Sequence, residues 1–424
     1  MAQPVATSRR RAKGIQRIDL AYAQLASSEI ARDINRDVLL EIIRTRQPVS
    51  RADLSRISGL QPSTASAIVE QLIEEQWITE GVAALRPRGR PPTMLSLNAN
   101  MVIVVADIRP TQSIVAVVDL NGHFLNLETV PLYKDPARWV EKIITAMQRM
   151  IKEFPGRSFE GIGLSLPGRV DPDSQHLIFA PNLPWCDFDI KSAIEAKIPL
   201  QVEMDNAANA CLLSELWFGN MDGVRNAVLV TITEGIGTAI LANGQLVTGT
   251  KGLAGEFGHM CIDRSGPLCG CGRKGCWEMF ASSRAAINFY CDLKPNAERP
   301  DIISLLNLAA DGDASAIEAL SRQAKFLAHG LLTIITALAP EVIHLNGGLT
   351  SLWDRFGPIV AEELANSILA GKPPRLSVTS DVELSRLRGA AALVLQRHSG
   401  SRRIARGVAA EKSSKRRNPA STRA

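Results

Sequence analysis

A segment rich in cysteine and glycine near the middle of the chain restricts the fold more than any other feature. Residues 252–278 read GLAGEFGHMCIDRSGPLCGCGRKGCWE. One imidazole and three potential thiolates fall within this segment, at His259, Cys269, Cys271 and Cys276. The intervening glycines let the backbone fold around a tetrahedral ion. We therefore predict a metal site, with a group of buried, reduced cysteines as the alternative interpretation.

The donor set indicates which metal would bind. Sulfur and nitrogen ligands favour zinc over magnesium or calcium. One histidine and three cysteines fill the four positions of a tetrahedral site and leave none for an activated water, so the predicted role of Zn²⁺ is structural. Cys261 lies close enough to be a spare ligand, but we do not expect it to bind. The other cysteines are scattered and the total of seven is odd, which argues against a disulfide framework.

Length and hydrophobic content predict more than one domain. The chain has 424 residues, of which 46% are hydrophobic, and this is enough for at least two sizeable cores. The sequence opens with no basic-then-apolar signal and contains no run of about eighteen uncharged apolar residues. We therefore expect a cytoplasmic protein without a membrane segment.

Positive charge is concentrated at the two ends of the chain. Residues 1–98 carry 14 Lys and Arg against 10 Asp and Glu, and residues 401–424 carry 8 against 1. Residues 99–400 carry 26 against 32, so only the ends suit contact with phosphates. We expect residues 1–28 and 401–424 to be disordered basic extensions, with non-specific DNA affinity as the alternative.

Residues 29–98 predict a winged helix-turn-helix domain. Apolar residues recur at helical spacing behind Ser28, at Ile30, Ile34, Val38 and Ile42. A short helix follows between Ser50 and Gly59, and a third helix from Pro62 has a stripe of Ala65, Ile68, Val69, Leu72 and Ile73. Its start presents hydrogen-bonding side chains that suit a major groove, at Gln61, Ser63, Thr64 and Ser66. These helices alone would also fit an ordinary helical bundle.

A basic wing strengthens the DNA-binding interpretation. Residues 77–80 and 93–98 read as strands, and RPRGRPP at residues 86–92 lies between them. Proline keeps this segment extended, so Arg88 and Arg90 can reach into a minor groove. We predict that this domain binds double-stranded operator DNA.

The part of the chain from residue 99 to residue 400 predicts two α/β lobes. We expect an antiparallel meander of three strands, at residues 101–108, at residues 113–120 and in a third run that ends at Val130. A helix at residues 136–152 and a strand at residues 161–166 follow. The pattern repeats with strands at 228–233, 238–244 and 342–348. Duplicated lobes with a cleft between them suit a ligand that fastens the two halves together.

These features together resemble the ROK family, named for repressor, open reading frame and kinase. The likeness spans roughly residues 29–398, and its most specific part is GEFGH combined with CGCGRKGCWE. The helix-turn-helix with its GRP wing resembles the family's xylose and N-acetylglucosamine repressors. The resemblance implies a two-lobed, actin-like ATPase fold of the ribonuclease H-like type, as in sugar kinases. It also implies a homodimer or homotetramer.

The resemblance also implies which residues contact a sugar. The family's sugar-binding residues fall on Glu256, His259 and Glu278, with Pro167, Gly168, Arg169 and Asn206 completing the set. Carboxylates suit sugars because each oxygen accepts hydrogen bonds from neighbouring hydroxyls. For Glu278, a solvated or capping role is the alternative.

The chain departs from the family's kinases at the residue that performs the chemistry. The kinases carry a segment like Glu-Asn-Asp-Ala-Asn, whose Asp accepts a proton from the sugar hydroxyl, and residues 205–209 read DNAAN. This register, anchored by Glu215, puts Ala207 in place of the base. The phosphate loop Asp-x-Gly-x-Thr reads DIRPT here, with Arg109 replacing glycine, and Glu234 in the second loop repels polyphosphate.

We therefore favour a sugar-responsive transcriptional regulator, a repressor of carbohydrate genes with a catalytically inactive sugar-kinase-like domain. One alternative is an active ATP-dependent sugar kinase with an appended DNA-binding domain, and Ala207 argues against it. Another is a DNA-bound scaffold whose lobes bind a protein partner. The presence of Asn206, Glu256 and Glu278 argues against that scaffold.

Overall fold

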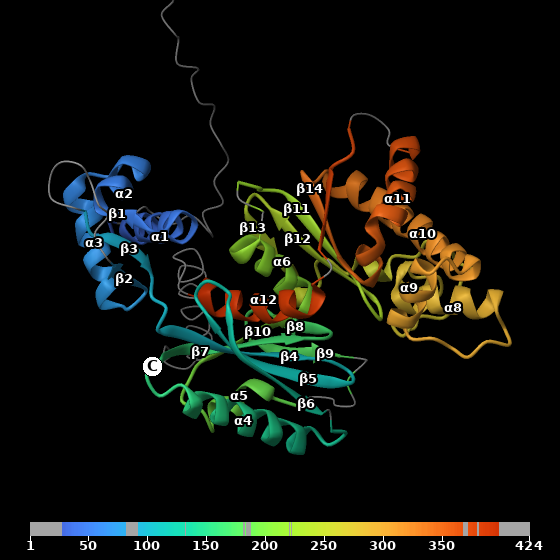
Figure 1. The fold of residues 1–424 in the computed structure, drawn as a ribbon, viewed down its shortest axis with the longest axis horizontal. Helices are drawn as coiled ribbons and strands as arrows, with labels where there is room; N and C mark the ends of the chain where they lie inside the picture. Colours follow the sequence, from blue (N-terminus) through green and yellow to red (C-terminus); the bar gives the residue numbers. More distant parts are fainter. Residues whose placement is uncertain are drawn as a thin grey trace, which may run out of the picture.

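The computed structural model describes residues 28–81, 92–131, 133–180, 183, 188–219, 221, 223–367, 372–379 and 381–397. Within these residues the chain forms a small N-terminal module followed by two sheets with helices around them (Figure 1). The basic segments predicted at the two ends lie outside the described residues, apart from Ser28, and so does the wing between Gly81 and Pro92.

The N-terminal module contains the predicted helix-turn-helix. Its helices are α1 (Ser28–Arg46), α2 (Arg51–Ser58) and α3 (Pro62–Glu74). Ser50 caps α2 by accepting a hydrogen bond from the backbone N–H of Asp53, and Gly59 ends it with a φ of 75°. A small sheet of order β1-β3-β2 completes the module, from Val49–Ser50, Met94–Leu97 and Ile78–Gly81.

The buried face of α1 differs from the prediction. Ile34 and Val38 are 53% and 41% exposed, whereas Leu39 and Ile43 are fully buried. Arg36 is also buried, and its Nε donates to Glu75 at 3.1 Å. Of the predicted stripe, Ile42 packs against the core and Ile30 is half-buried, whereas Ile34 and Val38 face outward because α1 carries a second apolar stripe one position further on. Spacing alone does not show which of the two stripes faces the core.

The first lobe is built on a five-stranded sheet with the order β10-β7-β4-β5-β6. In that order the strands are Val202–Asn206, Ser158–Leu166, Met101–Ile108, Gln112–Asp119 and Phe124–Pro131. Strands β4, β5 and β6 form the predicted antiparallel meander, whereas β7 runs parallel to both β4 and β10. Helices α4 (Pro136–Glu153) and α5 (Ile190–Glu195) cover one face (Figure 1). A ribbon of β8 (Arg169–Asp171) and β9 (His176–Phe179) lies at the end of β7.

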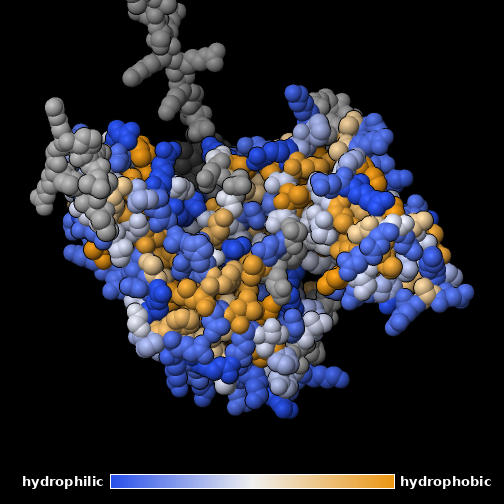
Figure 2. All heavy atoms as spheres, in the orientation of Figure 1, coloured by the Kyte–Doolittle hydropathy of each residue, from blue (hydrophilic) through white to orange (hydrophobic). Residues whose placement is uncertain are grey.

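Helix α4 shows how the sequence pattern specifies this layer. Trp139, Ile143 and Met147 recur at helical spacing and are fully buried against the sheet. The indole Nε1 of Trp139 donates to Ser113 Oγ on β5 at 3.1 Å, so the one polar atom of this buried ring has a partner. The outer face of α4 is hydrophilic, as the lower edge of the molecule in Figure 2 shows.

The second lobe has a sheet of order β13-β12-β11-β14-β15. These strands are Gln245–Val247, Ile236–Ala242, Ala227–Ile232, Val342–Gly347 and Arg375–Thr379. Its helices are α7 (Glu278–Ala281), α8 (Ser283–Leu293), α9 (Ile302–Ala310), α10 (Ala314–Leu338) and α11 (Trp353–Ser367). Short 3₁₀ turns form at Thr250–Gly252 (η1), Phe257–His259 (η2) and Gly348–Leu352 (η3). The long helix α10 shares its core with β11 and β14.

Two helices lie between the sheets and join the lobes, α6 (Ala207–Phe218) and α12 (Val382–Gln396) (Figure 1). Cys211 and Leu212 of α6 pack in one core with strands β11 and β12 of the second lobe. A Cβ at Gly389 of α12 would lie 1.9 Å from the carbonyl oxygen of Ala210, so the two helices touch backbone to backbone. The lobes are therefore connected through buried helix contacts.

The core of the N-terminal module continues into the first lobe. Leu39 of α1 and Leu97 of β3 belong to the same buried cluster as Ile103 of β4 and Leu387 of α12. Within the described residues, no helix combines the length and the apolar composition that crossing a membrane requires.

Candidate metal centre and ligand site

The four predicted metal ligands come together in one loop. The ligand atoms of His259, Cys269, Cys271 and Cys276 all lie within 4.8 Å of one another. The Sγ atoms of Cys271 and Cys276 are 3.5 Å apart, and Cys269 Sγ is 3.5 Å from His259 Nδ1. Two thiolates on one tetrahedral zinc ion lie about 3.8 Å apart, since each bond is about 2.3 Å long. The group therefore has the size of a four-coordinate site, and Cys261 is exposed and not part of it.

Two glycines shape the loop that carries this cluster. Gly272 and Gly275 have φ angles of 86° and 70°, in the left-handed region that favours glycine. A Cβ at Gly275 would lie 1.5 Å from the carbonyl oxygen of Asp263, so no larger residue fits there. The backbone N–H of Trp277 donates to the carbonyl oxygen of Met260 at 2.8 Å. These contacts bring the end of the loop beside the turn that carries the histidine.

Burial changes the proton affinity of two thiols in the cluster. Burial raises the pKa of Cys276 to about 11, and it raises the pKa of Cys269 as well. Thiols in such positions stay protonated at neutral pH unless a positive charge compensates for the lost hydration. The donor set and its dimensions thus both fit a bound metal ion.

Glu278 lies directly against the cluster. The Sγ of Cys269 donates to Glu278 Oε1 at 2.8 Å. Trp277 fixes this position because it is fully buried and its Nε1 donates to the carbonyl oxygen of Phe326 at 2.8 Å. The carboxylate also faces the turn before β12, where a Cβ at Gly235 would meet Glu278 Oε2 at 2.5 Å. One carboxylate therefore contacts both the cluster and the turn between β11 and β12.

The second nitrogen of His259 faces away from the thiols. His259 Nε2 is 3.7 Å from Glu256 Oε2, and Glu256 lies within the electrostatic reach of Arg169 from the first lobe. Arg169 Nε is buried and has no hydrogen-bond partner within the described residues. A Cβ at Gly252 would lie 2.3 Å from the carbonyl oxygen of Val170, so the loop before Glu256 packs on β8. Charged groups from both lobes thus lie close together.

The first-lobe part of the predicted ligand site forms where parallel strands end. Leu166 of β7 pairs with Asn206 of β10, so Gly168, two residues further along, lies near Asn206. Gly168 has a φ of 97°, and a Cβ there would lie 2.1 Å from the carbonyl oxygen of Phe179. Asn206 Oδ1 accepts from the backbone N–H of Asn209 at 2.8 Å and so caps α6. Gly168 and Asn206 therefore lie at the same end of the first sheet.

Ion pairs hold the segment compared above with the kinases' phosphate loop. Asp107, near the end of β4, is completely buried and accepts from Arg109 Nε at 2.6 Å and from Ser165 Oγ at 3.0 Å. Arg386 of α12 approaches the same carboxylate, with 3.9 Å between its Nη1 and Asp107 Oδ2. The sequence indicates Arg109 but not Arg386, because no local pattern shows that the last helix returns to β4.

The start of α6 carries no carboxylate on its first residue, Ala207. The preceding acidic residue, Asp205, is buried, and its Oδ1 accepts from the backbone N–H of Asn206 at 2.7 Å and from Asn209 Nδ2 at 2.9 Å. These two bonds orient the carboxylate of Asp205 at the start of the helix.

Helix α3 presents a polar surface at its N-terminal end. Gln61, Ser63 and Thr64 are exposed, and Ser66 is half-buried. The opposite face is buried as predicted at Ala65, Ile68, Val69 and Leu72, with Ile73 half-buried. Arg51 of α2 pairs with Glu70 of α3 at 2.6 Å and holds the two helices together. Arg88 and Arg90 lie in the wing segment outside the described residues.

Fold and site together define a two-lobed α/β domain of the sugar-kinase type that carries a His/Cys cluster and an N-terminal helix-turn-helix. The family profile of the ROK family matches residues 104–397, and the chain belongs to this family. The xylose repressor of Bacillus subtilis (strain 168) is 32% identical over 333 residues, which cover 77% of this chain and 85% of that protein. A glucokinase of Streptomyces coelicolor is 31% identical over 264 residues, which cover 58% of this chain and 82% of that enzyme.

Solved structures agree with the predicted fold class. A ROK family transcriptional regulator, a homologue of the Escherichia coli MLC protein, matches with a TM-score of 0.76 and 24% identity. The match covers 89% of this chain and 99% of that one. A ROK family glucokinase from Streptomyces griseus, in complex with glucose and AMPPNP, matches with a TM-score of 0.61 and 26% identity over 70% of this chain and 99% of that one. The prediction of an actin-like, two-lobed fold with an N-terminal helix-turn-helix is confirmed.

Proposed function

We propose that this chain is a sugar-responsive, DNA-binding transcriptional repressor of carbohydrate genes. The observation that carries the proposal is a helix-turn-helix with an exposed, polar α3 start, packed in one core with the first lobe of a ROK fold. The relatives named xylose repressors support it, because their similarity extends over about three quarters of this chain. DNA binding belongs to residues 29–98 and sugar binding to residues 99–400.

The proposed sugar site lies where Glu256, His259 and Arg169 approach one another. Glu256 offers acceptors, whereas His259 Nε2 and Arg169 Nε offer donors, and the Arg169 donor is buried without a protein partner in the described chain. Sugar hydroxyls both donate and accept, so one ring can satisfy all three side chains. Gly168, Asn206 and Glu278 complete the proposed set. A ligand held by groups from both lobes favours one particular lobe arrangement.

The proposed cofactor is one structural zinc ion on His259, Cys269, Cys271 and Cys276. When bound, the ion keeps the thiols deprotonated and fixes the direction of the imidazole. A deprotonated Cys269 no longer donates to Glu278, and the thiolate and carboxylate repel each other at the present 2.8 Å. Glu278 is then free to turn toward a sugar hydroxyl. Metal and sugar therefore favour one another.

The proposed repressor does not phosphorylate its sugar. Ala207 cannot accept a proton, and Arg109 fills the segment where the kinases have a flexible glycine. The exposed carboxylate of Glu234 further disfavours a triphosphate. An active sugar kinase with a DNA-binding domain is the second candidate, because glucokinases are among the relatives.

The assembly is proposed to be a homodimer or homotetramer acting in the cytoplasm. A palindromic operator has two half-sites, and each needs its own recognition helix. Two copies of α3 are therefore the smallest set that reads such a site.

Thermal unfolding of the full-length protein with a panel of sugars tests the proposed function. D-xylose, D-glucose and N-acetyl-D-glucosamine are compared with D-mannitol, an open-chain control. We expect one ring sugar to raise Tm and to change the affinity for a DNA fragment selected by the protein from a random pool. ATP-dependent phosphorylation should be absent in both the natural protein and Ala207→Asp. Sugar phosphorylation by the natural protein would support the kinase instead.

A further inference from the structure

Helix α6 connects the proposed sugar site with the DNA-binding module. Its cap, Asn206, belongs to the sugar site, and its last two residues, Trp217 and Phe218, lie beside the module. Twelve helical residues span about 18 Å at about 1.5 Å per residue. Because α6 packs in the core of the second lobe and against α12, a change in the lobe arrangement displaces it as a rigid rod.

The first contact at the far end of α6 is made by Arg44 of α1. Its Nη1 donates to the carbonyl oxygen of Trp217, and its guanidinium lies 5.7 Å from the centroid of the indole ring. Glu41 orients the same guanidinium by accepting from Nε at 2.8 Å and from Nη2 at 2.6 Å. The side chain of Arg44 is only 14% exposed, and these contacts are stronger in partly dehydrated surroundings.

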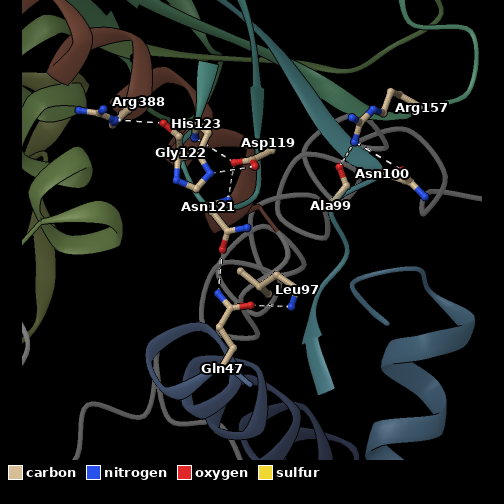
Figure 3. A network of polar contacts seen from close by, with 10 residues as sticks. All are labelled: Gln47, Leu97, Ala99, Asn100, Asp119, Asn121, Gly122, His123, Arg157 and Arg388. Carbon is tan, nitrogen blue, oxygen red and sulfur yellow. Dashed lines mark hydrogen bonds and ion pairs between the residues drawn. The ribbon is translucent and has the colours of Figure 1, made fainter. Parts of the chain in front are cut away.

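The second contact runs through the turn between β5 and β6, shown in Figure 3. Gln47, which follows α1, donates from Nε2 to Asn121 Oδ1 at 2.7 Å and accepts at Oε1 from the backbone N–H of Leu97 at 2.8 Å. Asp119 stiffens the turn by accepting from the backbone N–H groups of Asn121 and His123, at 2.8 and 2.9 Å. One amide side chain thus ties together α1, β3 and the first lobe.

The same turn rests on both helices that lie between the lobes. Arg388 of α12 donates from Nε to the carbonyl oxygen of Gly122 at 3.1 Å (Figure 3). A Cβ at Gly122 would lie 2.8 Å from the ring of Phe218, so the turn touches the end of α6. Two residues before Arg388, Arg386 reaches the buried Asp107. Both helices therefore contact the turn that Gln47 joins to the module.

We propose that α6 and the β5–β6 turn transmit the state of the sugar site to the DNA-binding module through Arg44 and Gln47. The inference rests on the proposed function and adds the route of its regulation. Arg44 and Gln47 are positioning residues, because each contacts the first lobe or α6 and neither belongs to the proposed sugar or DNA contacts.

The test uses full-length protein, D-xylose and a DNA fragment selected by the natural protein from a random-sequence pool. The double variant Arg44→Ala/Asn121→Ala removes both contacts, and Arg149→Ala removes a comparable pair with Glu128 away from the module. D-xylose should change the DNA Kd of the natural protein and of Arg149→Ala about tenfold, and that of the double variant by less than about twofold. The D-xylose Tm shift and the sugar-free Kd should stay unchanged. A full D-xylose response in the double variant would overturn the route.

A sugar-free double-mutant cycle separates this route from the proposed function. Asn206→Ala alters the cap of α6, so it should change the DNA Kd of the natural protein but not that of Arg44→Ala/Asn121→Ala. If D-xylose neither raises Tm nor changes the DNA Kd, the choice of sugar is wrong and the cycle still decides the route. Equal effects of Asn206→Ala in both backgrounds, including no effect in either, would overturn it. The single variant Asn121→Ala changes no residue of the module. It shows whether losing the lobe-side partner of Gln47 is enough to weaken the effect of D-xylose on the DNA Kd.

Discussion

Among single residues, Cys276 gives the sharpest test of the metal assignment. It is fully buried, and its Sγ lies 3.5 Å from that of Cys271. We expect Cys276→Ser to lose the proposed zinc ion and several kcal/mol of unfolding free energy, because metal binding and folding are coupled at such sites. Zinc released from denatured protein to a chromogenic chelator measures the first effect, and urea unfolding measures the second. Cys261→Ser is the matched control, since Cys261 is exposed and outside the cluster.

Linkage extends this prediction to the sugar. If the metal and the sugar favour each other through Glu278, the cognate sugar should slow the loss of zinc to a chelator. Stopped-flow chelation with and without saturating sugar measures the two rates. Equal rates in a protein that binds both ligands would leave the metal as a structural element without influence on the sugar.

His344 of β14 makes the stability depend on pH. The residue is buried, with Nδ1 3.2 Å from Ser377 Oγ and Nε2 3.6 Å from Glu215 Oε1 on α6. Burial lowers the pKa of His344 from 6.5 to about 4, and burial raises the pKa of Glu215. In both groups the fold favours the uncharged form.

We expect His344 to reduce stability as the pH falls from about 6.5 to about 4, by up to about 3 kcal/mol. In this window the unfolded chain binds a proton that the folded chain does not. Glu215 acts in the opposite sense, because its contribution is present at low pH and is lost as the pH rises through its raised pKa. Urea unfolding from pH 4.5 to 7.5 should show a weaker decline for His344→Gln than for the natural protein. Parallel plots of unfolding free energy against pH for the two proteins would contradict this. Metal release at low pH is common to both proteins, so it cancels in the difference between their unfolding free energies.

Among the elements, the turn of the helix-turn-helix depends on Gly59. Its φ is 75°, and a Cβ there would meet no atom within 4 Å. The cost of Gly59→Ala is therefore backbone strain alone, about 1 kcal/mol, and Gly59→Asn should cost less. Gly156→Ala is the control, since that position is equally uncrowded and its φ lies outside the left-handed region. Among Gly59→Ala, Gly59→Asn and Gly156→Ala, thermal unfolding should give the lowest Tm for Gly59→Ala. Identical Tm values would show that the turn does not depend on the left-handed conformation at Gly59.

The elements also show what can be predicted from the sequence. Helix α3 is predictable because its stripe is the only apolar one and Pro62 marks its start. The metal cluster is predictable because all four ligands lie in one short loop, so their meeting needs no long-range contact. The buried face of α1, the two-residue strand β1 and the approach of Arg386 to Asp107 are not predictable. Each of them depends on tertiary packing between segments far apart in the chain.

At the scale of the whole molecule, truncation tests whether the module binds DNA and the lobes bind the sugar. A protein lacking residues 1–98 should lose operator binding and keep its sugar-dependent rise in Tm, because the proposed sugar residues all follow residue 98. Its Tm without sugar should be lower, since Ile103 and Leu387 lose their neighbours in the shared core. Gel-shift and thermal-unfolding measurements check both. Operator binding by the truncated protein would show that DNA recognition lies elsewhere.

The position of α12 determines when the first lobe can be completed during synthesis. Leu387, Ala390 and Val394 of α12 cover the sheet whose strand β4 begins at Met101. At about 5–20 residues per second, the ribosome makes α12 roughly 15 to 60 s after β4. Throughout that interval the part of the apolar sheet face that α12 covers in the finished protein stays exposed. A message truncated anywhere before α12 therefore yields a substrate for chaperones and proteases rather than a shortened regulator.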